Sequence, residues 1–356
     1  MSKMWRNNAI ARIKADERRS GDTNLLRVWF PKVPEIDLYL KDESNHKTGS
    51  LKHRLARSLY TFAIVNGLID QNTVVFEASS GNTAISEAYF AQLLDLKFVA
   101  VMARSTSRAK IKRVEKLGGI CHLVENSGED RATAGALAED EGGHFMDQFT
   151  YAERATDWKA SNNVAESTLK QMELEPHPIP RWYVCSAGTG GTSATIGRHL
   201  TYQSLPTQLC VVDPENSVYY DFYKQRDRSL TSNFSSRIEG IGRRSVESSF
   251  IPTVISRMMR VPDAASIAAI RFLADLTGIH AGGSTGTNLY GAIKLIVEMK
   301  DAHETGSIVS LICDSGQIYA DTYYNDEWLK RMEIDIKPYL KQLKHYYKTG
   351  DWIDVK

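Results

Sequence analysis

Four short segments of the chain hold the residues best suited to chemistry on a small molecule. Lys52 follows a glycine turn and begins a predicted helix within residues 48–54 (TGSLKHR). The other segments are 79–83 (SSGNT), 186–192 (SAGTGGT) and 313–316 (CDSG), each after an apolar, strand-like run. A lysine at a helix start is ordinarily a solvated surface side chain, but its amine is also the group that forms Schiff bases with carbonyl compounds. The other three segments favour the second interpretation.

The glycine-rich run 188–192 (GTGGT) predicts a phosphate site. It follows a strand-like segment and opens a predicted helix, where backbone N–H groups and the helix dipole favour a dianion. Asp213 fits the acidic residue of a dinucleotide fingerprint, but Ser193 stands where its third glycine would be, and no Gly-Lys-Ser/Thr of a P-loop follows. One phosphate cradle, one lysine amine, an asparagine and a serine together match the groups that pyridoxal phosphate needs.

These segments require a scaffold of parallel strands and helices. Strand-like and helix-like segments alternate from residue 36 to residue 312, so the predicted fold class is α/β, with two lobes, mostly parallel sheets and a ligand cleft between the lobes. The N-terminal lobe is predicted to span 1–149, of which the first ~35 residues are candidates to pack on the other lobe. The C-terminal lobe is predicted to span 150–356, with a helical tail at 337–347 that packs on the body or on a second subunit.

The composition favours a globular chain with a small-molecule ligand. Hydrophobic residues make up 42% of 356 residues, and 44 Lys and Arg nearly balance 43 Asp and Glu, so we expect no nucleic-acid or membrane partner. No apolar run approaches the ~18 residues of a membrane span, and residues 1–16 lack a signal-peptide core, so a cytoplasmic location is expected. The four cysteines lack CxxC spacing and are interpreted as buried thiols rather than disulfides or metal ligands.

Taken in order, the segments resemble those of the fold-type-II pyridoxal-phosphate enzymes, the superfamily of tryptophan synthase β and cysteine synthase. The resemblance covers about residues 20 to 325 and includes the opening motif 21–27 (GDTNLLR). It implies a tryptophan synthase β-like fold, pyridoxal 5′-phosphate as the cofactor, an amino-acid substrate and a homodimer.

The resemblance also implies a role for each segment. Lys52 takes the Schiff-base position and is the expected catalytic residue. Asn82 meets the O3′ of the ring, and Ser315 forms a hydrogen bond with the pyridine nitrogen. The phosphate is held by Gly188, Thr189, Gly190, Gly191 and Thr192. The substrate carboxylate is held by Ser79, Ser80, Asn82, Thr83 and Gln148, and no metal is expected.

Within the superfamily, the details are more similar to the cysteine-synthase-like L-cysteine desulfhydrases than to the O-acetylserine sulfhydrylases. His46-Lys47 replaces the usual Asn-Pro, His53 replaces an Asp, and Ala78-Ser79 replaces Pro-Thr. An insertion at 243–249 (RRSVESS) begins with two arginines that are interpreted as solvated loop residues rather than as selectors of an anionic substrate. The segments that support the desulfhydrase resemblance are 50–57, 147–150, 153–158, 213–217 and 283–288.

The resemblance therefore implies a lyase that converts L-cysteine to sulfide, pyruvate and ammonia. The Lys52 amine is expected to remove the Cα proton as a general base, and a serine at the ring nitrogen suits β-elimination. A cysteine synthase, which adds a thiol to an activated serine such as O-acetylserine, would share every cofactor residue and is the alternative. A non-catalytic protein of the same fold would be expected to have lost Lys52 or the glycine run, and both are intact.

Overall fold

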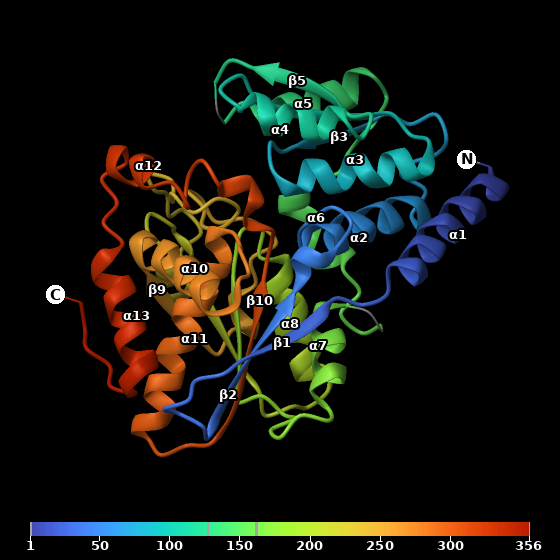
Figure 1. Cartoon of the computed structure of the whole chain (residues 1–356). Helices are drawn as coiled ribbons and strands as arrows, with labels where there is room; N and C mark the ends of the chain where they lie inside the picture. Colours follow the sequence, from blue (N-terminus) through green and yellow to red (C-terminus); the bar gives the residue numbers. More distant parts are fainter. Residues whose placement is uncertain (1, 127, 161–162, 356) are drawn as a thin grey trace. The chain divides into compact units, whose positions relative to one another are not determined.

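A computed structural model of the chain describes residues 2–126, 128–160 and 163–355 (Figure 1). The chain forms two compact units: unit 1 comprises Met1–Asp22 and His46–Asp157, and unit 2 comprises Thr23–Asn45 and Trp158–Lys356. The predicted lobes, 1–149 and 150–356, differ from these units in two places. Residues 23–45 belong to unit 2 because their strands join its sheet, and residues 150–157 belong to unit 1 because they continue a helix that packs there.

Unit 1 is built on a four-stranded parallel sheet of order β5-β4-β3-β6. One face of this sheet packs on α2 and α3 through apolar side chains, including Leu59 of α2 and Ala88 of α3, and α5 covers the other face. The elements of unit 1 are α1 (Lys3–Ser20), α2 (Lys52–Val65), β3 (Val75–Ala78), α3 (Asn82–Leu94), β4 (Phe98–Ala103), α4 (Arg108–Glu115), β5 (Ile120–Val124), α5 (Asp130–Asp140), β6 (His144–Phe145) and α6 (Gln148–Ala155).

Unit 2 is built on a six-stranded sheet of order β1-β2-β10-β7-β8-β9, in which only the edge pair β1–β2 is antiparallel. Figure 1 shows α10, α11 and α13 on one side of this sheet and α7 and α8 on the other. The strands are β1 (Asn24–Val28), β2 (Ile36–Asp42), β7 (Trp182–Ser186), β8 (Gln208–Pro214), β9 (Arg257–Val261) and β10 (Gly306–Ile312). The α-helices are α7 (Val164–Met172), α8 (Gly191–Tyr202), α9 (Tyr219–Gln225), α10 (Asp263–Thr277), α11 (Gly283–Asp301), α12 (Asp326–Arg331) and α13 (Lys337–Thr349). Three short 3-10 turns are η1 (Glu43–Asn45), η2 (Pro252–Val254) and η3 (Gly316–Tyr319).

The structure confirms the predicted α/β class with two mostly parallel sheets. It also confirms that the tail helix, α13, packs on the body, where its aromatic side chains meet Phe30 and Phe272. The sequence did not predict α1, β1, β6, α6, α9 or α12.

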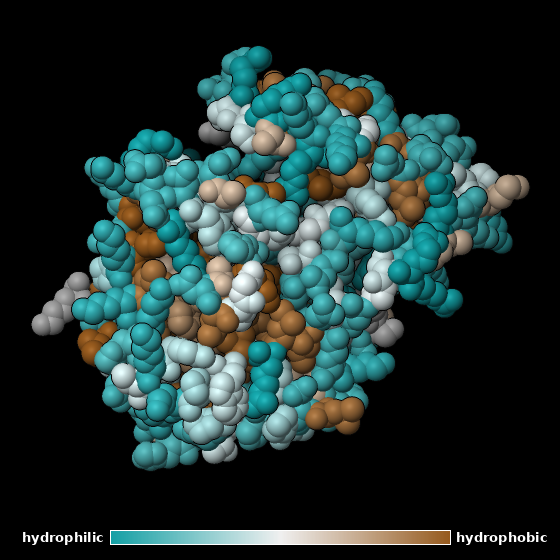
Figure 2. All heavy atoms as spheres, in the orientation of Figure 1, coloured by the Kyte–Doolittle hydropathy of each residue, from teal (hydrophilic) through white to brown (hydrophobic). Residues whose placement is uncertain are grey.

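The surface of each unit is mainly polar on the face that Figure 2 shows. The exposed large apolar side chains of unit 2 include Trp29, Leu174, Ile179 and Tyr202. Within residues 2–126, 128–160 and 163–355, every helix is too short or too polar to span a lipid bilayer.

Candidate active site

In unit 1, the predicted substrate residues lie at one edge of the sheet. Residues 79–82 follow β3, and Gln148 follows β6, the parallel neighbour of β3. The carboxyl ends of parallel strands lie at the same edge of a sheet, which is where ligands bind in open α/β folds. Ser79, Ser80 and Asn82 are half-buried, whereas Thr83 and Gln148 are buried.

Lys52 is the first residue of α2 and is half-buried. The turn before it includes Gly49 at φ +76°, a left-handed conformation that glycine adopts without strain. Ser50 is fully buried, and its hydroxyl accepts a hydrogen bond from the Lys52 backbone N–H (3.3 Å). The Thr48 hydroxyl lies 2.9 Å from the Ser86 hydroxyl of α3. The Lys52 turn is therefore tied to the helix that begins with Asn82.

The two histidines beside Lys52 form a stacked pair. The rings of His46 and His53 are 4.9 Å apart, and His53 also packs against Tyr89 and Phe90. Burial, followed by the nearby His46, lowers the pKa of His53 to about 3. His53 is therefore neutral near pH 7 and supports the Lys52 segment as a packed aromatic ring.

A chain of hydrogen bonds links the two predicted substrate segments to β3. The Thr83 hydroxyl donates to the Gln148 side-chain oxygen (2.8 Å), and the Gln148 backbone N–H donates to Glu77 Oε2 (3.1 Å). Asp147, just before Gln148, adopts φ +43° and forms an ion pair with Arg131 (2.8 Å). A non-glycine residue in this conformation is strained, so Arg131 and Glu77 hold the start of α6 in a set geometry.

In unit 2, the glycine-rich loop connects β7 to α8 and is shaped by backbone contacts. A Cβ atom at Gly188 would overlap the Gly240 carbonyl oxygen. Gly190 has φ +91°, and a Cβ there would lie 2.5 Å from Phe250 Cα. The Tyr219 hydroxyl donates to the Gly188 carbonyl (2.7 Å), and its ring stacks on Phe250 at 4.0 Å. Only glycine fits at these two positions.

The loop fits a phosphate group. It ends at the N-terminus of the 12-residue helix α8, whose first turn contains no acidic residue. The first N–H groups of a helix have no intrahelical acceptor, and together with the helix dipole they favour a dianion. Thr189 and Thr192 add hydroxyls, and the Thr189 hydroxyl accepts from the Gly191 N–H (3.2 Å).

Ser315 lies at the same edge of the unit 2 sheet as the glycine loop. It follows β10, and β10 is the parallel neighbour of β7, from which the glycine loop emerges. Ser315 forms a β-bridge with Ala281, and its hydroxyl accepts from the Gln317 N–H (3.4 Å). The adjacent Gly316 cannot carry a side chain, because a Cβ would lie 2.6 Å from the His280 backbone. The backbone on either side of Ser315 is therefore fixed.

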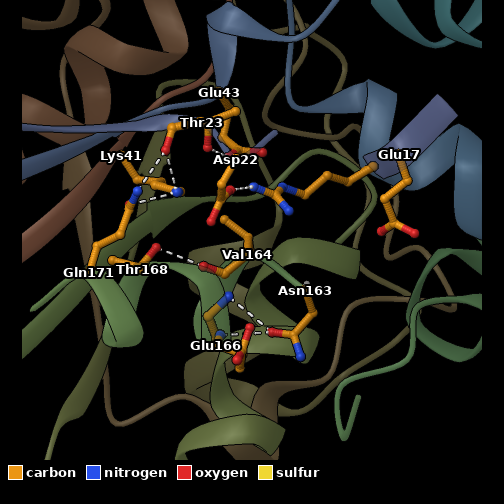
Figure 3. Close-up of polar contacts among 12 residues, drawn as sticks. Glu17, Asp22, Thr23, Lys41, Glu43, Asn163, Val164, Glu166, Thr168 and Gln171 are labelled. Atoms are coloured by element: carbon orange, nitrogen blue, oxygen red, sulfur yellow. Dashed lines mark hydrogen bonds and ion pairs between the residues drawn. The ribbon is translucent and has the colours of Figure 1, made fainter. Parts of the chain in front are cut away.

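A buried polar network lies where β1 and β2 meet α7 in unit 2. Figure 3 shows Lys41, which is fully buried, between Thr23 and Gln171. Its ammonium donates to the Thr23 carbonyl (2.7 Å) and to the Gln171 side-chain oxygen (2.7 Å), and the Thr23 hydroxyl donates to Glu43 (2.7 Å). This network fixes η1 next to the end of β10 and thus braces the strand that leads to Ser315.

The insertion at 243–249 lies against the glycine loop, since a Cβ at Gly190 would lie 2.7 Å from the Ser249 carbonyl oxygen. The preceding Gly242 N–H donates to the Ala187 carbonyl (2.9 Å), and Arg243 forms an ion pair with Glu247 (2.7 Å). The Arg244 guanidinium is exposed and donates to the Ser232 carbonyl (3.0 Å). The interpretation of both arginines as simply solvated is therefore wrong for Arg243, which is paired with a buried carboxylate.

Two parallel-sheet units that carry a lysine turn and a glycine-rich phosphate loop define a cofactor-dependent α/β enzyme. The model of the family described as pyridoxal-phosphate dependent enzyme matches residues 18–314, and the chain belongs to this family. Pyridoxal phosphate is its cofactor. A relative from Mycobacterium tuberculosis, L-cysteine desulfhydrase Cds1, is 55% identical over 99% of this chain and 97% of its own length.

Solved structures of related proteins share the fold. An O-ureido-L-serine synthase matches with a TM-score of 0.74 and 24% identity, over 86% of this chain and 96% of the other. A hydrogen sulfide-producing enzyme from Fusobacterium nucleatum matches with a TM-score of 0.72 and 24% identity, over 86% of this chain and 98% of the other.

Sequence reasoning missed several residues that shape the site. Glu77, Tyr219 and Phe250 contact site segments directly but belong to none of the motifs. Glu77 did leave a signal, since it is a lone charge within an apolar strand, and such a charge is buried only with a partner. The sequence contains no comparable signal for Tyr219 and Phe250, because their contacts with the glycine loop depend on how distant segments of the chain fold back onto it.

Proposed function

We propose that this protein is a pyridoxal-phosphate-dependent L-cysteine desulfhydrase, a carbon–sulfur lyase that converts L-cysteine to sulfide, pyruvate and ammonia. The observation that carries the proposal is the 55% identity to an L-cysteine desulfhydrase along nearly the full length of both chains. For each group of the cofactor, one unit or the other contains a predicted binding residue.

Different residues of the chain are proposed to bind different groups of the cofactor. Lys52 would bind the aldehyde carbon through its amine, and Asn82 would hold O3′. The N–H groups of Gly188–Thr192 would hold the phosphate, and Ser315 would form a hydrogen bond with the ring nitrogen without placing a charge on it. When bound, pyridoxal phosphate supplies an electron-accepting ring that stabilises negative charge at the substrate Cα.

The reaction uses few protein groups. Ser79, Ser80, Thr83 and Gln148 bind the substrate carboxylate and thereby orient Cα. The Lys52 amine, once free, would accept the Cα proton as a general base. The electron pair of that bond forms the Cα–Cβ double bond, and sulfide leaves from Cβ. Hydrolysis of the released three-carbon product gives pyruvate and ammonia.

We also propose a homodimer in the cytoplasm. The dimer would be expected to cover exposed apolar side chains of unit 2, such as Leu174 and Ile179, which lie at or near a surface pocket between α7 and α8. A reducing compartment agrees with four cysteines that form no disulfide among the described residues. Sedimentation of Ile179→Glu should give monomers where the unaltered protein gives dimers.

The test of the activity is incubation of the purified holoenzyme with L-cysteine as the sole substrate. Sulfide and pyruvate should form in equal amounts, and Lys52→Ala should form neither. If turnover instead requires O-acetylserine together with sulfide and yields cysteine, the protein is a synthase and the proposal is wrong.

A further inference from the structure

Unit 1 buries two carboxyl groups that the proposed mechanism does not use. Glu77 on β3 and Glu87 on α3 are both fully buried. Along β3, Glu77 lies on the same face as Val75, which packs in the apolar cluster of α2 and α3. The Glu87 carboxyl meets it from α3 and lies within hydrogen-bonding reach.

Two ionised carboxylates cannot satisfy each other, because both only accept hydrogen bonds. Among the described residues, neither oxygen of Glu87 has a hydrogen-bond donor, and Glu77 Oε1 also lacks one. Burial raises the pKa of both groups, and their mutual repulsion raises that of Glu87 further. One proton held between them removes the repulsion and supplies the missing donor.

The location of the proton follows from the surroundings of each group. Glu77 accepts the backbone N–H of Gln148 and is stabilised as an anion by backbone hydrogen bonds. Glu87 has no such donor, so the proton belongs on Glu87. The other groups that act on the pair are Lys52 of α2, which favours a charged Glu87, Asp147 before α6, which disfavours a charged Glu77, and the buried Tyr60 hydroxyl of α2.

The pair closes a ring of contacts around the substrate segments. Glu87 lies four residues after Thr83, so the two side chains share one face of α3. Thr83 bonds the Gln148 side chain, and the Gln148 N–H bonds Glu77. A bond from Glu87 to Glu77 completes the ring through β3, α3 and α6.

We propose that Glu87 is a positioning residue of the substrate-carboxylate site. Its carboxyl keeps a proton at neutral pH and donates a hydrogen bond to Glu77, which in turn holds Gln148 against Thr83. The role rests on the proposed function, because that function assigns Thr83 and Gln148 to the substrate carboxylate. Loss of the proton would place two negative charges side by side and loosen the start of α6.

Kinetics of two variants test the role. Glu87→Leu leaves Glu77 without its donor, so the KM for L-cysteine should rise about tenfold, the effect of one lost buried hydrogen bond, with a smaller change in kcat. Glu87→Gln carries an N–H donor and should restore KM to within about threefold of the unaltered protein. In the unaltered protein KM should also rise at alkaline pH, and in Glu87→Gln this rise should be absent. Equal KM values and equal pH profiles in all three proteins would overturn the role.

Infrared spectroscopy of the holoenzyme without substrate tests the proton itself. The difference between the unaltered protein and Glu87→Gln at neutral pH should contain the C=O band of a protonated carboxylic acid. Glu139→Gln, which changes an exposed carboxylate of the same unit, should leave that band unchanged. A difference spectrum without the band would overturn the proposal. The band needs no turnover, so its presence in a protein that releases no sulfide would refute the proposed activity but leave the protonated pair intact.

Discussion

The two units shape their predicted site segments by different physical means. In unit 1, the predicted residues are side chains at the starts of α2, α3 and α6, and a buried polar network orients them. In unit 2, the predicted phosphate loop offers its backbone, and its shape is set by close contacts that exclude any side chain. Substitutions in unit 1 should therefore change the chemistry of the site, whereas substitutions in the unit 2 loop should change its shape and its hold on the cofactor.

The largest effect is expected from removal of the Lys52 amine. Lys52→Ala should lower the rate of sulfide release by at least about a thousandfold, because it removes both the covalent attachment and the general base. It should also lose the borohydride-reducible link to the cofactor, which mass spectrometry of the reduced protein would detect. Lys97→Ala, which changes an exposed lysine of the same unit, serves as the control and should keep both properties.

Addition of a methyl group to the glycine loop tests whether close backbone contacts set the shape of this loop in unit 2. Gly190→Ala should release the cofactor and destabilise the protein by about 2–4 kcal/mol, because the added Cβ meets the Phe250 backbone in a conformation that disfavours side chains. Gly278→Ala has a similar φ of +77° but open space, and should cost only about 1 kcal/mol. Cofactor retention on gel filtration and urea unfolding would measure both variants. Equal losses in the two would mean that φ alone, and not the close contact, requires glycine.

Loss of the Thr83 hydroxyl in unit 1 should weaken substrate binding without releasing the cofactor. Thr83→Val removes the bond to Gln148 and should raise the KM for L-cysteine about tenfold, whereas Thr83→Ser should stay close to the unaltered value. Steady-state kinetics would measure the difference. If Thr83→Val lost the cofactor as Gly190→Ala does, the distinction drawn between the predicted site segments of unit 1 and the glycine loop of unit 2 would be wrong.

A further effect concerns the pH dependence of stability. The folded pair retains a proton that the unfolded chain releases above the ordinary glutamate pKa of 4.5, because burial raises the pKa of Glu87 in the folded state. The folded state then binds more protons than the unfolded state, so stability falls as pH rises, by up to about 1.4 kcal/mol per pH unit. Urea unfolding between about pH 6 and about pH 8 should show this slope in the unaltered protein and a shallower one in Glu87→Gln. Parallel slopes would contradict the retained proton.

The sequence was enough to predict the fold class and the positions of the short motifs. Lys52 and the run 188–192 are local signals, since a turn and a strand-to-helix connection are encoded by adjacent residues. The sequence indicated only that the first ~35 residues could pack on the other lobe. It could not predict that residues 23–45 join the unit 2 sheet while the preceding segment stays in unit 1, because β2 pairs with β10 across more than half the chain. It did not pair Glu77 with Glu87 either, although each is a charge within an apolar segment, because their contact depends on how α3 packs against β3. The assigned roles of the site residues remain predictions until the variants are measured.

The most direct test of the central claim is the sulfide balance when the holoenzyme receives L-cysteine, O-acetyl-L-serine and a known amount of sulfide together. A desulfhydrase releases sulfide from cysteine whether or not an activated serine is present, so dissolved sulfide should accumulate steadily together with pyruvate. If added sulfide instead disappears while cysteine increases, the protein uses sulfide as a substrate, and the account of it as a desulfhydrase is contradicted.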